Sequence, residues 1–150
     1  MTHPSPVHSN RRLPGKMQRW QRLASFWLLG ACCASGLAWF GGLDLLQVPV
    51  PRLRFWWVSH GATSLVALVL IGAALPQHLI VTWKAGRNRR HGIFLVAGLV
   101  LLLASALGLL YGLEEWHETV HWLHVVTGMA MAIVFPWHVW RGRRQTALYR

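Results

Sequence analysis

The chain has 150 residues, which is enough for one domain. Apolar residues make up 54% of it and charged residues only 13%, about half the share found in a typical soluble domain. The net charge of +11 could suit nucleic acid, but the basic residues form short tracts beside long apolar segments and no single binding face. This composition excludes a nucleic-acid-binding domain and predicts a protein that is embedded in membrane lipid.

Four apolar segments follow one another, each near the length of about 20 residues that a helix needs to cross a bilayer. The predicted helices cover residues 21–40, 54–84, 92–113 and 117–141. They form a transmembrane domain over residues 20–144, between a disordered basic tail at 1–19 and a short tail at 145–150. Residues Leu29–Cys32 loosely resemble a lipoprotein cleavage box, but the apolar run continues to Phe40, so we expect no cleavage. The expected fold is all-α, an up-down-up-down bundle of four transmembrane helices.

The charged residues predict the orientation of this bundle. The N-terminal tail, the second connection and the C-terminal tail are strongly basic, with Arg11, Arg12, Lys16, Arg19, Arg22, Lys84, Arg87, Arg89, Arg90, Arg141, Arg143, Arg144 and Arg150. The first and third connections hold Arg52, Arg54 and all four acidic residues, Asp44, Glu114, Glu115 and Glu118. Because positive flanks stay in the cytoplasm, we expect both termini there, in a bacterial inner membrane.

An internal repeat relates the second and fourth segments. Pro76-Gln77-His78 corresponds to Pro136-Trp137-His138, and each is followed by a tryptophan and basic residues. Near the opposite ends, His60 and His124 each precede a threonine by three positions. In an up-down-up-down bundle these two helices run in the same direction, which brings the matching ends to similar depths.

Six of the nine histidines fall on the second and fourth predicted helices, where an ionisable side chain is costly and therefore a functional candidate. His60 and His78 are 18 residues apart, so they share a helix face and lie about 27 Å apart along its axis. His124 and His138 are 14 residues apart, within about 40° of one face and about 21 Å apart. This spacing predicts that His60 faces His124 near the outer surface. At the inner surface His78 would face His138.

Two opposed imidazoles on separate helices suit six-coordinate haem iron, a centre that carries electrons. Cys32 and Cys33 form no CxxCH motif, so we expect two non-covalently bound haems b and no c-type haem. His121 is an alternative outer ligand to His124, or a hydrogen-bond donor to a haem propionate. Glycines that would let a flat ring approach the backbone occur on the same two helices, at Gly61, Gly72 and Gly128. Cationic side chains available to the propionates are Arg54 outside and Lys84, Arg87 or Arg141 inside.

With these residues the chain resembles the bacterial four-helix membrane cytochromes b. The 14-residue spacing of His124 and His138, with Gly128 between them, is similar to that of haem-binding helices in respiratory cytochrome b. The 18-residue spacing of His60 and His78 departs from that pattern. The resemblance implies a non-catalytic electron-transfer subunit of an oxidoreductase that works between a quinone pool or inner-side donor and a periplasmic protein such as a c-type cytochrome. It implies no particular dehydrogenase partner, because the first helix lacks the histidine of the hydrogenase and formate dehydrogenase type subunits.

Two other functions compete with this interpretation. His117, His121 and His124 share one face of the fourth helix beside Glu118, a pattern that also suits a zinc or copper transporter or sensor. Alternatively, the histidines are interfacial side chains of a structural or assembly protein without a cofactor.

Overall fold

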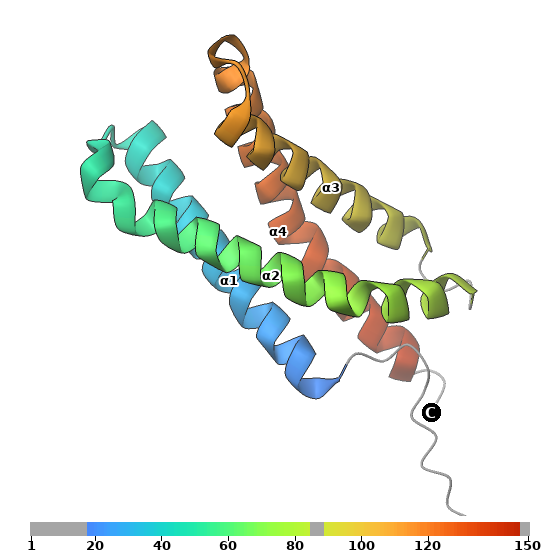
Figure 1. Ribbon diagram of the computed structural model, residues 1–150. Coiled ribbons are helices and arrows are strands. Elements are labelled where there is room, and N and C mark those ends of the chain that lie inside the picture. The colour runs from blue at the N-terminus through green and yellow to red at the C-terminus, as the bar shows by residue number, and fades with distance from the viewer. Residues whose placement is uncertain (1–17, 85–88, 148–150) are drawn as a thin grey trace, which may run out of the picture.

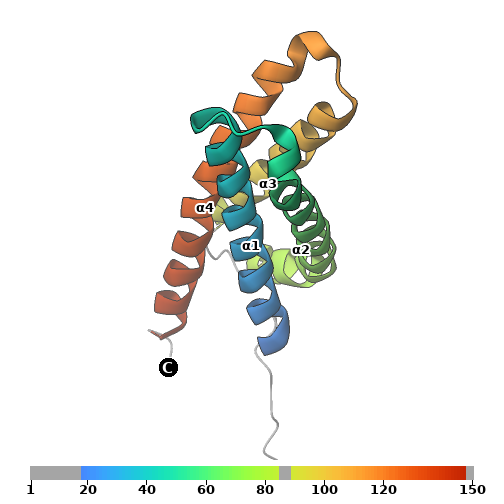
Figure 2. The ribbon, with the colours of Figure 1, turned by 90° about the vertical axis from the view of Figure 1, so that its left-hand side faces the viewer.

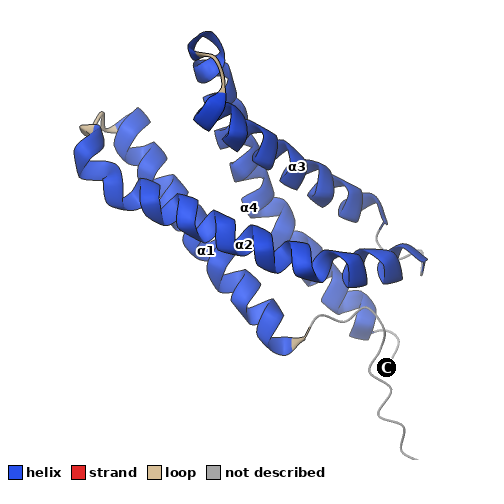
Figure 3. Ribbon diagram, in the orientation of Figure 1, coloured by secondary structure: helices blue, strands red, loops and turns tan. Residues whose placement is uncertain are grey.

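The computed structural model describes residues 18–84 and 89–147, and these residues are almost entirely helical. The elements are α1 (Arg19–Phe40), the π-helical turn η1 (Gly41–Leu45), α2 (Val50–Lys84), α3 (Arg89–Tyr111), the 3₁₀ turn η2 (Glu114–Trp116) and α4 (His117–Ala147). Figure 3 shows helices joined by short loops and no strand among the described residues. Four of these helices are long and apolar enough to cross a membrane. The predicted all-α bundle of four such helices is confirmed.

The helix boundaries differ from the predicted ones by a few residues. α2 begins at Val50, because Pro51 fits the first turn of a helix, where no backbone N–H is needed. α3 ends at Tyr111, before Gly112, a residue type that commonly ends helices. α4 continues to Ala147, so the segment predicted as a C-terminal tail from residue 145 begins as helix. α1 begins at Arg19, and the predicted disordered tail before it lies outside the described residues except for its last two positions.

Two antiparallel hairpins make up the bundle, the first from α1 and α2 and the second from α3 and α4. Most contacts between helices lie within these hairpins. Figures 1 and 2 show the two turns η1 and η2 at one end, with the start of α1 and the end of α4 at the other. The chain therefore runs up, down, up and down, and the residues that flank the second connection lie at the same end as the basic flanks of α1 and α4.

The interior between the hairpins holds few large side chains. Among the described residues, the buried apolar ones are Leu53, Ala67 and Ala74, and no side chain is less than 2% exposed. Aromatic pairs bridge the hairpins toward each end: Phe40 with Trp122 at 6.0 Å between ring centroids, and Phe26 with Phe135 at 5.5 Å. The bundle therefore has a sparse core of its own, while its large apolar side chains point outward, as lipid contact permits.

Candidate functional site

The histidines of α2 and α4 meet in two pairs. The outer pair, His60 and His124, lies toward the end of the bundle with η1 and η2, and the inner pair, His78 and His138, lies toward the opposite end. The ring centroids of His60 and His124 are 6.1 Å apart, with an angle of 89° between the ring planes. Those of His78 and His138 are 6.4 Å apart, with an angle of 79°. The structure thus brings together the same partners that the helical spacing predicts, although α2 and α4 separate their histidines by different numbers of residues. The helices accommodate this difference by crossing obliquely, as Figure 1 shows.

Only side chains span the distance between α2 and α4 at these pairs. In the described part of the chain, no Cα atom of α2 lies within 8 Å of a Cα atom of α4. Helices that pack directly have axes about 8–10 Å apart and bring many Cα atoms closer than this. The two helices therefore do not pack directly against each other, and the imidazoles of each pair meet between them.

The separation within each pair suits one shared metal ion. An imidazole nitrogen lies about 2 Å from a transition metal that it ligates, and the ring centroid is roughly 1 Å further away. Two imidazoles on opposite sides of one ion therefore place their centroids about 6 Å apart. The separations of 6.1 and 6.4 Å match this value at both pairs.

The imidazole of His60 is oriented by α1. Its Nδ1 lies 2.9 Å from the backbone oxygen of Cys32 and 3.6 Å from the Cys32 Sγ. Since a carbonyl oxygen only accepts hydrogen bonds, Nδ1 carries the proton and the lone pair is on Nε2. The ring also lies against Gly36, where a Cβ atom would stand 2.9 Å from both Cε1 and Nδ1. A side chain at position 36 would therefore displace this ring.

The imidazole of His124 is oriented by α3 in a similar way. Its Nδ1 lies 2.8 Å from Oγ of Ser105, whose hydroxyl in turn lies 3.0 Å from the backbone oxygen of Leu102. Ser105 is only 3% exposed. Both outer histidines therefore have an Nδ1 partner on the adjoining helix of their own hairpin, an arrangement typical of metal-ligating histidines.

His138 of the inner pair differs from both outer histidines in this respect. Nδ1 of His138 is buried and has no hydrogen-bond partner among the described residues. His78 and His138 each follow a proline by two positions, Pro76 and Pro136, and neither proline ends its helix. A proline leaves one backbone carbonyl of the preceding turn without its helical N–H partner, so both inner histidines follow a weakened turn.

His121 has a partner other than His60. Its Nε2 lies 3.1 Å from Oδ1 of Asp44, which belongs to η1, and the second carboxylate oxygen of Asp44 is buried with no hydrogen-bond partner in the part of the chain that the structure describes. This contact joins the outer end of the first hairpin to α4. Of the two candidate outer ligands, the structure places His124 opposite His60 and His121 beside Asp44.

The remaining polar candidates do not form a further cluster. His117 is exposed at the start of α4, and His91 lies 3.4 Å from the guanidinium of Arg141. Cys32 and Cys33 are free thiols. Within the residues that the structure describes, no three His, Cys, Asp or Glu side chains converge as they would around a metal ion held by protein ligands alone. The face of α4 with His117, His121 and His124 therefore shows no preformed zinc or copper site.

Three glycines named from the sequence have space beside them. A Cβ atom at Gly61 or Gly72 would meet nothing within 4 Å, and one at Gly128 would meet only Leu102 Cδ2, at 3.9 Å. These glycines therefore do not serve the packing of one helix against another. Two residues that the sequence did not single out matter instead: Gly36 leaves room for the His60 ring, and Ser105 bonds to His124.

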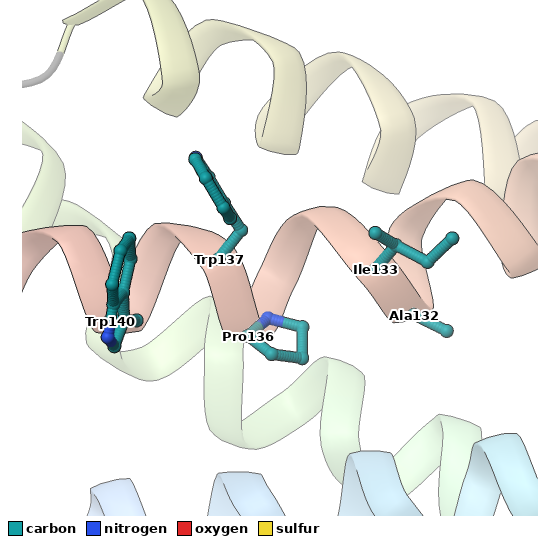
Figure 4. Close-up of a pocket in the computed structure, with 5 residues that line it drawn as sticks. All are labelled: Ala132, Ile133, Pro136, Trp137 and Trp140. Atoms are coloured by element: carbon teal, nitrogen blue, oxygen red, sulfur yellow. The ribbon is translucent and has the colours of Figure 1, made fainter.

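A shallow apolar hollow lies on α4 near the inner end, lined by Ala132, Ile133, Pro136, Trp137 and Trp140 (Figure 4). Its lining comes from one helix. His138 lies on roughly the opposite side of α4, about 170° around the axis from the middle of this lining. The hollow is therefore on a different face from the histidine pairs and does not belong to their site.

Comparison with protein-family models, with curated proteins and with solved structures finds no match for this chain.

Proposed function

We propose that this protein is a membrane-embedded b-type cytochrome subunit that carries electrons across the bilayer through two stacked haems. The observation that carries this proposal is the pair of His–His approaches, at 6.1 and 6.4 Å between ring centroids, on two helices whose described Cα atoms are all more than 8 Å apart. When bound, haem supplies a reversible one-electron change of its iron between the ferric and ferrous forms. His60 and His124 would hold the outer haem, and His78 and His138 the inner one.

The residues of the chain would contribute orientation and charge. The Cys32 carbonyl and the Ser105 hydroxyl hold Nδ1 of the outer imidazoles, which leaves Nε2 of each ring as the ligand atom. If two histidines hold each haem, the site would leave no protein-free position for a substrate, and the haem would supply electron transfer. Cationic side chains at the two surfaces, such as Arg54 at the outer end and Arg141 at the inner end, are available to the haem propionates.

The charge distribution supports an orientation with both termini in the cytoplasm of a bacterial inner membrane. The basic flanks of α1, α3 and α4 lie at one end of the bundle, and all four acidic residues belong to segments at the other. By the positive-inside rule, the basic end is cytoplasmic. The inner haem would then exchange electrons with a quinone pool or an inner-side donor, and the outer haem with a periplasmic protein such as a c-type cytochrome. The acidic outer end suits a basic partner.

The test is a dithionite-reduced minus oxidised spectrum of the purified protein, with pyridine haemochrome quantitation. We expect two haems b per chain, one in either His60→Ala or His78→Ala, and none in the double variant. His117→Ala and His91→Ala are matched controls and should retain two. A haem-free protein purified from a host that supplies haem would contradict the proposal. Metal analysis would then distinguish a zinc or copper function from a cofactor-free structural one.

A further inference from the structure

Ser105 is a buried polar residue in the apolar part of α3, and its side chain contacts a histidine of another helix. It is 3% exposed, and its Oγ lies 2.8 Å from Nδ1 of His124. Two other buried serines, Ser25 and Ser35, hydrogen-bond only to carbonyl oxygens of their own helix, α1. Ser105 is therefore not explained by the usual bond of a serine to its own helix alone.

The direction of this hydrogen bond follows from the number of available protons. The Ser105 hydroxyl has one proton, and the Leu102 carbonyl oxygen, 3.0 Å away, can only accept it. Oγ of Ser105 therefore accepts the Nδ1–H of His124. This bond selects the tautomer of His124 whose lone pair is on Nε2, and it draws the Nδ1 proton away from the ring.

The inner site lacks this arrangement at the corresponding residue. His138 is the counterpart of His124 at the inner pair, and its buried Nδ1 has no partner among the described residues. An imidazole whose N–H donates a hydrogen bond is a more basic ligand and stabilises the higher charge of the metal. The midpoint potentials of the two iron sites should therefore differ, because Nδ1 of His124 has a hydrogen-bond partner and Nδ1 of His138 has none among the described residues.

We propose that Ser105 is a positioning residue that lowers the midpoint potential of the outer haem by hydrogen bonding to Nδ1 of His124. This inference rests on the proposed function. When bound there, haem would supply a one-electron change with a redox mediator as electron donor, in which no covalent bond forms or breaks. Ser105 acts through His124 and opposes this reduction, so removal of its hydroxyl should favour the ferrous form.

The experiment is a potentiometric titration of the haem-loaded, full-length protein and three variants: Ser105→Ala, Ser105→Thr and Ser25→Ala. In Ser105→Ala we expect the ferrous-to-ferric ratio of one haem to rise by up to tenfold at a fixed applied potential, a shift of up to 59 mV for one electron. The other haem should titrate as in the wild type. Ser105→Thr retains the hydroxyl and should restore the wild-type curve. Ser25→Ala removes a similarly buried hydroxyl that bonds to the Gln21 carbonyl oxygen of its own helix, and it should change neither haem.

The outcomes separate this inference from the function on which it rests. A wild-type protein without haem overturns both. Two haems with unchanged potentials in Ser105→Ala overturn the inference and leave the proposed function standing, as would an equal shift in Ser25→Ala. If Ser105→Ala binds only one haem, its potential cannot be compared, and the haem content and potentials of Ser105→Thr provide the test. Recovery of the second haem at its wild-type potential supports a positioning role, whereas its absence overturns it.

Discussion

His60 and Gly36 lie so close together that a Cβ atom at position 36 would stand 2.9 Å from two atoms of the imidazole ring. The ring is held there by the hydrogen bond from its Nδ1 to the carbonyl oxygen of Cys32, one turn before Gly36 on α1. The position of one outer histidine of α2 therefore depends on a residue of α1 that has no side chain.

The first prediction concerns Gly36. Alanine at this position should displace the His60 ring from the Cys32 carbonyl and reduce the haem content from two to about one per chain. Gly30→Ala is the matched control, because a Cβ atom there meets nothing within 4 Å. Alanine favours a helix over glycine by about 1 kcal/mol, so lost helix propensity cannot explain a defect in Gly36→Ala. Two haems with a wild-type spectrum in Gly36→Ala would show that the ring does not need this contact.

The second prediction distinguishes His124 from His121 as the outer ligand. His124 faces His60, whereas His121 lies 3.1 Å from Asp44. We expect His124→Ala to lose one haem and His121→Ala to retain both, as measured by pyridine haemochrome. Asp44→Asn should also retain both, since it alters only the partner of His121. The opposite pattern would assign the outer site to His121.

The third prediction concerns packing within the second hairpin. A Cβ atom at Gly108 of α3 would lie 3.0 Å from Cγ1 of Val120 on α4, and a β-branched side chain in a helix has little freedom to move away. Gly108→Leu should therefore destabilise the protein by about 1–3 kcal/mol, the usual cost of overpacking. Gly92→Leu, on the same helix with open space around it, should be close to neutral. Thermal unfolding of both variants in the same detergent provides the comparison, and equal melting temperatures would contradict the packing described here.

The fourth prediction concerns orientation in the membrane. In a background of Cys32→Ala and Cys33→Ala, a membrane-impermeant maleimide should label Glu115→Cys from outside intact spheroplasts. Arg90→Cys, at the opposite end, should react only after permeabilisation, because its basic surroundings remain in the cytoplasm. Labelling in the reverse order would invert the proposed orientation.

The fifth prediction concerns the Cys32 thiol, which the cysteine-free background removes. His60 bonds to the backbone oxygen of Cys32 at 2.9 Å, while the Sγ atom is at 3.6 Å. Alanine retains the backbone oxygen, so Cys32→Ala should keep both haems and their potentials in a redox titration. A loss of the outer haem would show that the thiol itself orients His60.

The sequence by itself determined the four apolar helices, their order and the face on which each histidine lies. These properties depend on apolar length and on the 3.6-residue period of a single helix, and both can be read locally. The same period predicted that His60 would meet His124 and that His78 would meet His138, since α2 and α4 run in the same direction. Helix ends were less predictable, because α4 remains helical through its polar end to Ala147.

Only the tertiary structure decided which atoms of α1 and α3 hold the outer histidines. The Cys32 carbonyl, Gly36 and Ser105 reach the imidazoles through the rotation and register of one helix against another, which no periodicity within either helix specifies. The same holds for the choice between His121 and His124, which lie within about 60° of each other on α4. Their roles differ because η1 places Asp44 beside His121, whereas α2 places His60 opposite His124.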